Sequence, residues 1–188
     1  AHMFEHMAFK GTDKIGTTDY AAEKVVLAKV EKAYAAYIEE RDKRVGRDEQ
    51  KLKDLQKAWQ DDIADAQKYV KPNEFPQILE SNGAEGLNAS TAEDQTEYHY
   101  SFPENRLELW AYLESERFMH PVMREFYKER NVVIEESLMR VDSNPIGRLL
   151  EQFTTAAFHG HPYHRTGICG EAVLNSFSAT DAQPLFND

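Results

Sequence analysis

The chain has 188 residues, a formal net charge of −11 and 41% hydrophobic residues, which suits a single folded domain. The acidic balance and the lack of a Lys/Arg cluster argue against nucleic acid as a partner. No apolar run is long enough to span a membrane, and the single cysteine, Cys169, excludes an internal disulfide framework. These features do not determine the cellular compartment. An extracytoplasmic, periplasmic location would need a signal peptide upstream of residue 1.

A candidate metal-binding pentapeptide, His2-Met3-Phe4-Glu5-His6, opens the sequence. In a helix, His2 and His6 lie one turn apart on the same face, where two imidazole nitrogens can bind one zinc ion. Glu5 then lies within reach of a water molecule at that ion. The H-x-x-E-H order is that of the inverzincins, so the pentapeptide predicts a zinc-dependent peptidase. The alternative is a chance pattern, because the chain contains seven His and is rich in Glu.

Two highly charged segments follow, residues 20–44 and 48–70. Apolar residues recur in them at three- and four-residue steps: Val26, Val30, Ala33 and Tyr37, then Leu52, Leu55, Trp59, Ile63, Ala66 and Val70. This spacing predicts two helices that pack along a coiled-coil-like seam. With a turn at Val45-Gly46-Arg47, residues 20–71 are expected to form an antiparallel helical hairpin, in which Trp59 packs the seam and binds nothing.

The middle of the chain predicts strands and then a helix. Residues 83–101 alternate weakly and contain β-favouring residues, which indicates a strand with its neighbours. Residues 104–119 carry apolar side chains at helical spacing directly after Pro103, which predicts an amphipathic helix with its aromatic residues in the core. The spaced residues are Leu107, Trp110, Ala111, Leu113 and Phe118.

A further predicted helix, residues 124–141, has no internal Gly or Pro and carries a pair of acidic residues. Glu129 and Glu136 are seven residues apart, so they lie two turns apart on one stripe. The stripe can place Glu136 on a metal and Glu129 behind it, as a carboxylate that orients a ligand. The alternative is that these side chains face solvent, as charged helix faces usually do.

The last third completes an α+β pattern. Residues 145–158 predict a helix, and residues 159–164 predict a loop because they contain Gly and Pro, so their histidines are expected to be structural. Cys169 is expected to be a small buried residue. A last helix is expected from about residue 178, capped by Ser178 or Thr180. In the first of these helices, the side chains expected to point inward are Leu149, Leu150 and Phe153.

Several blocks, in this order, resemble the pitrilysin/insulinase family of zinc metallopeptidases. The similarity begins with His2-x-x-Glu5-His6 and the downstream pair Glu129-x6-Glu136. It extends to Met7-Ala8-Phe9-Lys10-Gly11-Thr12, to the segment from Gly86-Leu87-Asn88-Ala89 to Thr96, to His161-Pro162-Tyr163-His164-Arg165 and to Ile168-Cys169-Gly170. The blocks fall within residues 1–18 and 75–181.

The resemblance implies a zinc endopeptidase site. One Zn²⁺ would be held by His2, His6 and Glu136, with Glu129 behind the ligands and water in an open fourth position. Glu5 would be the general base. The implied fold is part of a mitochondrial-processing-peptidase-like domain, with an antiparallel or mixed sheet packed by helices.

The resemblance also implies how substrate is held. Asn88 and Ala89 would lie on a strand that pairs with an extended peptide or unfolded polypeptide. Phe9 would line a pocket for a substrate side chain. The family uses a second homologous half, in the same chain or in a partner subunit, and no segment here matches that half.

Two departures from the family pattern define the remaining expectations. His6 and Glu136 are much further apart than in family members, and the inserted hairpin, residues 20–71, accounts for the surplus. The metal helix has no strands before it, so residues 1–188 are expected to be a truncated N-terminal metallopeptidase domain. The alternatives are a zinc-binding but inactive subunit or fragment that serves partner binding, or a helical interaction module with a coincidental pentapeptide.

Overall fold

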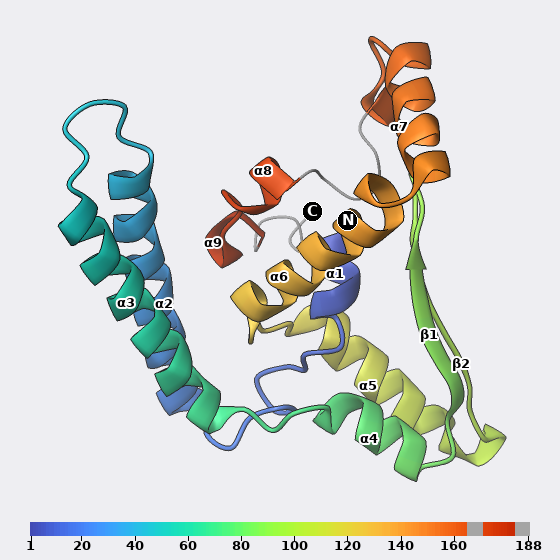
Figure 1. Ribbon diagram of the computed structural model, residues 1–188. Helices are drawn as coiled ribbons and strands as arrows, with labels where there is room; N and C mark the ends of the chain where they lie inside the picture. Colours follow the sequence, from blue (N-terminus) through green and yellow to red (C-terminus); the bar gives the residue numbers. More distant parts are fainter. Residues whose placement is uncertain (165–170, 183–188) are drawn as a thin grey trace.

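The computed structural model describes residues 1–164 and 171–182. These residues form a mostly helical fold with one two-stranded antiparallel sheet, which confirms the α+β class (Figure 1). In chain order the elements are α1 (His2–Met7), α2 (Tyr20–Arg41), α3 (Glu49–Ala66), η1 (Gln67–Tyr69), α4 (Glu74–Ser81), β1 (Glu85–Thr91), β2 (Thr96–Ser101), η2 (Glu104–Arg106), α5 (Leu107–Met119), α6 (Phe126–Ser137), the π-helical turn η3 (Leu138–Asp142), α7 (Pro145–Ala157), η4 (Pro162–His164), α8 (Glu171–Leu174) and α9 (Ala179–Ala182). The expectations for Cys169 and its neighbours fall outside the described residues.

Helices α2 and α3 pack against each other as an antiparallel pair that projects from the rest of the molecule (Figure 1). Each begins at an aspartate whose carboxylate accepts hydrogen bonds from the first-turn amides: Asp19 from Ala22, and Asp48 from Gln50 and Lys51. The first helix ends at Arg41, a few residues before the predicted end at Arg44.

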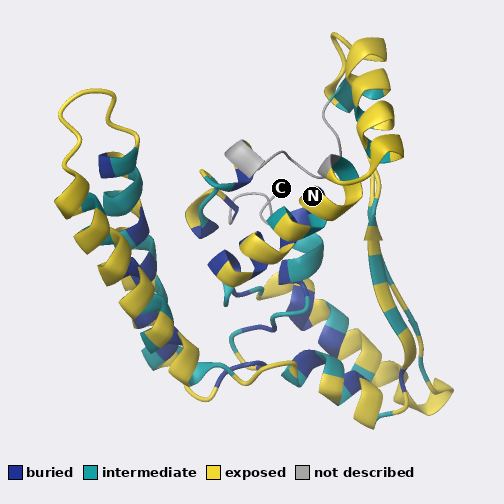
Figure 2. Ribbon diagram, in the orientation of Figure 1, coloured by how far each residue is buried: buried dark blue, intermediate teal, exposed yellow. Residues whose placement is uncertain are grey.

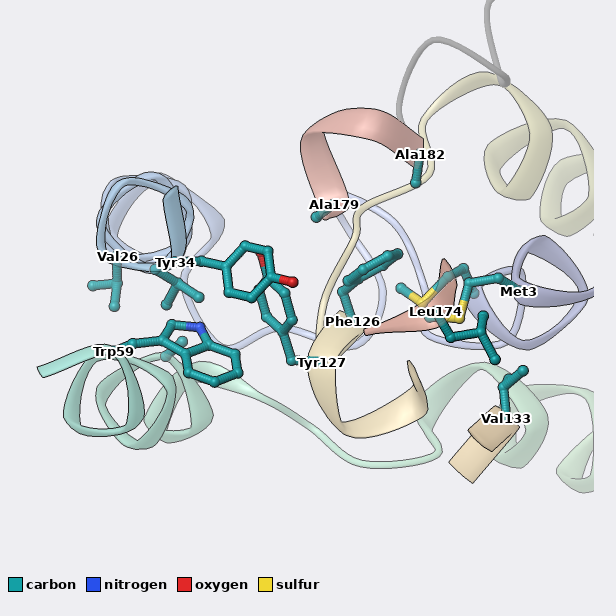
Figure 3. Packing of buried hydrophobic residues seen from close by; sticks show 13 residues of the cluster. Met3, Val26, Tyr34, Trp59, Phe126, Tyr127, Val133, Leu174, Ala179 and Ala182 are labelled. Atoms are coloured by element: carbon teal, nitrogen blue, oxygen red, sulfur yellow. The ribbon is translucent and has the colours of Figure 1, made fainter. Parts of the chain in front are cut away.

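An aromatic cluster joins this helix pair to α6. Trp59 stacks on Tyr37 with ring centroids 5.6 Å apart, and Tyr34 lies 4.5 Å from the Tyr127 ring of α6. Tyr34, absent from the predicted stripe, is only 2% exposed because it faces α6 as well as α3. From these rings the buried cluster continues through Phe126 to Met3 of α1 and Val133 of α6 (Figure 3).

The base of the helix pair is closed by backbone hydrogen bonds. The Thr18 amide donates to the Tyr69 carbonyl at 2.8 Å, and the Lys71 amide donates to the Gly16 carbonyl at 3.0 Å. The segment therefore leaves and rejoins the body of the molecule at adjacent points. Gly16 has φ +90°, and a Cβ there would lie 2.7 Å from a guanidinium nitrogen of Arg124, so this position requires glycine.

A buried arginine ties the loop after α1 to both α2 and the segment before α6. Arg124 donates from Nε and Nη2 to the two carboxylate oxygens of Glu23, at 2.5 and 2.8 Å. It also donates to the carbonyls of Lys10, Thr12 and Ile15. Arg124 is 1% exposed and Glu23 is fully buried, so each charge depends on the other for compensation.

Strands β1 and β2 form a ribbon beside α1 (Figure 1). The register pairs Ala89 with Tyr98 and Thr91 with Thr96, and it shifts between Glu85 and Asn88. Residues 83–101 thus form the predicted strand together with a partner strand. Leu87 and Tyr100 of the ribbon pack against a second apolar cluster, which consists of Ile15, Phe75, Leu79, Ala84 and Leu113.

Two predicted helices have exposed apolar faces instead of the expected inward-facing ones. In α5, Trp110 and Phe118 are 43% and 50% exposed, whereas Leu113 and Arg117 are buried. In α7, Leu149, Leu150 and Phe153 are exposed, and the helix lies mainly against the short turns η3 and η4 at its ends (Figure 2). The periodicity predicted each helix correctly but carried no information about what covers its apolar face.

None of the helices in residues 1–164 and 171–182 combines the length and apolar character that crossing a bilayer requires.

Candidate metal centre

The short helix α1 presents different residue types on adjacent faces. Met3 and Met7, four residues apart, are 5% and 1% exposed and belong to the same buried cluster as Val133 of α6. A helix of six residues is unstable alone, so this packing holds α1 in place. His2 and His6 lie one position earlier in each turn, about 100° around the helix axis, where they face Glu136.

Three candidate ligand atoms converge between α1 and α6. Nε2 of His2 and Nε2 of His6 lie 3.4 and 3.5 Å from Oε2 of Glu136, and the three atoms lie within 4.8 Å of one another. Two imidazole nitrogens and one carboxylate oxygen form a ligand set typical of catalytic zinc sites. The donor atoms and their convergence therefore fit zinc.

The two histidines differ in their electrostatic surroundings. Burial lowers the pKa of His2, which favours the neutral form that can bind metal. A hydrogen bond with Glu129 raises the pKa of His6 and outweighs the opposing effect of burial. The rings meet edge to face with centroids 5.0 Å apart.

Glu129 lies behind His6, as the stripe on the predicted helix suggested. Its Oε2 is 3.3 Å from Nδ1 of His6, so Nε2 of that ring is left to face Glu136. Its Oε1 is 2.6 Å from Nζ of Lys10. Burial alone would raise the pKa of Glu129, but the contacts with His6 and Lys10 lower it. The carboxylate therefore stays ionised and can orient the imidazole.

Glu5 is not one of the three converging residues and has its own partner. Thr91, at the end of β1, donates from Oγ1 to Oε2 of Glu5 at 2.5 Å. Oγ1 of Thr91 is also 3.0 Å from Oγ1 of Thr96. Since the single Thr91 proton goes to Glu5, Thr96 is the donor in the second contact. The strand pair thus fixes the carboxylate of Glu5 beside the three candidate ligands.

The three predicted substrate-binding residues lie on and beside β1. Asn88 is exposed and Ala89 is half-buried, opposite Tyr98 on β2. The ring of Phe9 lies 5.8 Å from the ring of Tyr98. Within the described residues β1 pairs only with β2, so the other edge of β1 has no strand partner in this part of the chain.

The histidine-containing loop after α7 makes contacts within itself and with the turn between β1 and β2. Nδ1 of His161 accepts from the Tyr163 amide at 3.3 Å, and the Tyr163 hydroxyl donates to Asp94 at 2.6 Å. Within residues 1–164 and 171–182, the His2, His6 and Glu136 group is the one cluster with metal-binding spacing.

Three neighbours of the site were not predicted from the sequence. Lys10 contacts Glu129, Thr91 contacts Glu5, and Arg140 lies 2.6 Å from Oε1 of Glu136. Only the contact of Arg140 could have been predicted from the sequence, because a basic residue four positions after an acidic one on a helix commonly forms an ion pair with it. The other two contacts depend on the tertiary fold.

Comparison with known proteins places the chain among the peptidases. Residues 64–171, more than half of the chain, match the family described as Insulinase (Peptidase family M16). The chain belongs to this family, which confirms the predicted membership. The matched segment includes Asn88, Glu129 and Glu136, whereas the His2–His6 pentapeptide precedes it.

Two relatives are proteases of Helicobacter pylori. The zinc protease PqqE is 37% identical over 103 residues, which make up 54% of this chain and 23% of that protein. A protease crystal structure is 33% identical with a TM-score of 0.58, over 62% of this chain and 28% of that one. The chain thus spans less than a third of the length of either relative.

Proposed function

We propose that this chain carries the metal site of a zinc-dependent endopeptidase and is one segment of a larger enzyme. The observation that carries the proposal is the convergence of His2, His6 and Glu136 from two distant segments, with Glu5 held beside them by Thr91. A protein that used zinc only for structure would need a fourth protein ligand and no carboxylate base. Membership of the insulinase family and the zinc protease relative support the same reading.

In the proposed reaction, His2, His6 and Glu136 would hold a zinc ion, and that ion would polarise the attacking water and the scissile carbonyl. Glu5 takes a proton from the water and then delivers a proton to the leaving amine. The hydrogen bond from Thr91 fixes which carboxylate oxygen of Glu5 is free for that transfer. Glu129 keeps the ring of His6 oriented.

The proposed substrate is an extended peptide or unfolded polypeptide that pairs with the other edge of β1. Backbone groups at Asn88 and Ala89 would hydrogen-bond to the substrate main chain, which gives affinity without sequence selectivity. Phe9 would contact a substrate side chain. A second homologous half, in the same chain or in a partner subunit, is part of the proposal because this chain spans less than a third of its relatives.

The proposed architecture is a truncated N-terminal metallopeptidase domain of mitochondrial-processing-peptidase type over residues 1–188, with residues 20–71 inserted as a helical hairpin. The segment that contains α2 and α3 starts and ends at neighbouring points of the backbone, which supports this proposal. An insertion whose ends are close together leaves the site between α1 and α6 undisturbed.

The first test is zinc content after dialysis against zinc, for the unaltered chain, Glu136→Gln and Glu135→Gln. Glu135 is exposed and points about 100° away from Glu136 on the same helix, so its variant is a matched control. We expect one zinc per chain for the unaltered chain and the control, and clear loss for Glu136→Gln. Equal zinc content in all three would contradict the ligand assignment.

The second test separates an active enzyme from a zinc-binding inactive subunit. In the full-length protein, Glu5→Gln should keep zinc and abolish peptide hydrolysis, because the amide cannot accept the proton. Turnover equal to that of the unaltered protein would refute the assignment of Glu5 as base.

A further inference from the structure

The carboxylate of Glu136 has different partners on its two oxygens. Oε2 faces Nε2 of His2 and of His6, at 3.4 and 3.5 Å. Oε1 points the other way and lies 2.6 Å from Nη2 of Arg140. A guanidinium that occupies one oxygen leaves the other as the natural metal ligand.

The backbone that carries Arg140 has an unusual conformation. Residues Leu138–Asp142 form a π-helical turn, in which the Ser143 amide donates to the Leu138 carbonyl at 2.8 Å. Single π-helical turns are rare in helices and occur frequently at functional sites. Here the turn directly follows the helix that supplies Glu136.

A glycine in α7 fixes the position of this turn. A Cβ at Gly147 would lie 2.1 Å from the carbonyl oxygen of Arg140, a distance that no side chain can tolerate. Asn144 caps α7 by accepting from the amides of Ile146 and Gly147, at 3.0 and 3.3 Å. The start of α7 therefore packs against the Arg140 backbone, and this close approach is available only to glycine.

We propose that Arg140 is a positioning residue that restricts Glu136 to metal binding through a single oxygen, Oε2. The inference rests on the proposed function. A carboxylate free on both oxygens can bind a metal through both and occupy the position that a catalytic site keeps open for water. Occupation of Oε1 by Arg140 prevents this and limits the rotation of the Glu136 side chain.

This i,i+4 ion pair adds little to helix stability. Arg140 has a side chain 66% exposed, and such surface pairs contribute little to folding. The same exposure screens its charge, so its effect on a bound cation comes mainly from orientation of Glu136. Loss of a partner that orients a metal ligand typically weakens metal binding by about 10- to 100-fold.

The test compares Arg140→Met, Arg140→Lys and Gly147→Ala with the exposed control Arg148→Met, all in the 188-residue chain. Zinc affinity is measured by competition with a chromophoric chelator, and coordination by the visible spectrum of the cobalt-substituted protein. We expect Arg140→Met to bind zinc about 10-fold more weakly and to show a weaker cobalt band, as higher coordination numbers do. Arg140→Lys should recover part of both losses, and Arg148→Met should match the unaltered chain.

Gly147→Ala keeps the arginine and displaces its backbone, so it should weaken zinc binding in the same direction. Far-UV circular dichroism checks that each variant is folded. Zinc affinity and cobalt spectra of Arg140→Met equal to those of the unaltered chain would overturn the inference, and so would tighter binding. If the unaltered chain binds zinc and Glu136→Gln does not, an unchanged Arg140→Met variant refutes the role of Arg140 and leaves the proposed zinc site standing. If neither binds zinc, the proposed function fails and this inference fails with it.

Discussion

Replacing Arg124 with Met should destabilise the fold more than any surface change of similar size. The side chain makes two hydrogen bonds to Glu23 and three to carbonyls of the loop after α1, those of Lys10, Thr12 and Ile15. Met retains most of the volume but none of the donors. The variant would therefore leave the buried carboxylate of Glu23 without its counter-charge and remove a donor from three carbonyls, of which that of Ile15 keeps the Thr12 amide as a second donor.

The expected loss follows from these contacts. Removing one partner of a buried ion pair costs about 3–5 kcal/mol, because the remaining charge is uncompensated. Each lost carbonyl hydrogen bond adds about 0.5–1.5 kcal/mol, although such contributions are not additive. Domains are stable by about 5–15 kcal/mol in total. Arg124→Met should therefore be close to unfolded at room temperature.

Urea unfolding followed by tryptophan fluorescence measures this loss, since Trp59 is buried and Trp110 is half-exposed. Arg148→Met, an exposed change, should stay within about 0.5 kcal/mol of the unaltered chain. Combining Arg124→Met with Glu23→Leu should recover part of the loss, because no unpaired charge is then buried. A loss below about 1 kcal/mol for Arg124→Met, the size of one surface ion pair, would refute the reasoning.

Three further predictions concern α1, the groups behind it and the tip of the helix pair. Met7→Ala should cost about 2–5 kcal/mol in urea unfolding and weaken zinc binding by chelator competition; unchanged zinc affinity would mean that α1 is held by other contacts. Lys10→Met should weaken zinc binding about 10-fold, because Glu129 loses the cation that lowers its pKa; the exposed Lys57→Met is the control, and equal affinities would contradict the prediction. The Asp48 amide and two lysines lower the pKa of Glu40 from 4.5 to about 2, so its stabilising contribution is full above pH 4.5 and is lost as the pH falls towards 2. Stability curves of Glu40→Gln and the unaltered chain should therefore converge over that range, and a constant difference between them would contradict this.

Local patterns predicted the elements that carry the site. Four-residue spacing placed His2 and His6 on one face, and seven-residue spacing placed Glu129 and Glu136 on one stripe. These rules need only helix geometry, so they held without knowledge of the fold. The meeting of the two segments was predicted from the family resemblance, since no local rule relates residues 130 positions apart.

Other features were beyond the sequence because they depend on tertiary contacts. The pairs Arg124 with Glu23 and Thr91 with Glu5 join residues far apart in the chain. Each consists of residue types that are usually exposed, so nothing local marks them as buried partners. For α7 the prediction was wrong in the opposite direction: its periodic apolar residues were expected to be buried, and they are exposed.

Because the base of α2 and α3 is closed by hydrogen bonds, the length of this helix pair does not affect the geometry of the candidate metal centre. The aromatic contacts with α6 and the Glu23–Arg124 pair involve parts of these helices away from the tip at residues 42–48. Whole heptads could thus be added at the tip without any change in the distance between His6 and Glu136. The tip is accordingly a natural point for grafting a fluorophore or an affinity tag, because it is remote from the metal centre and its residues are largely exposed (Figure 2).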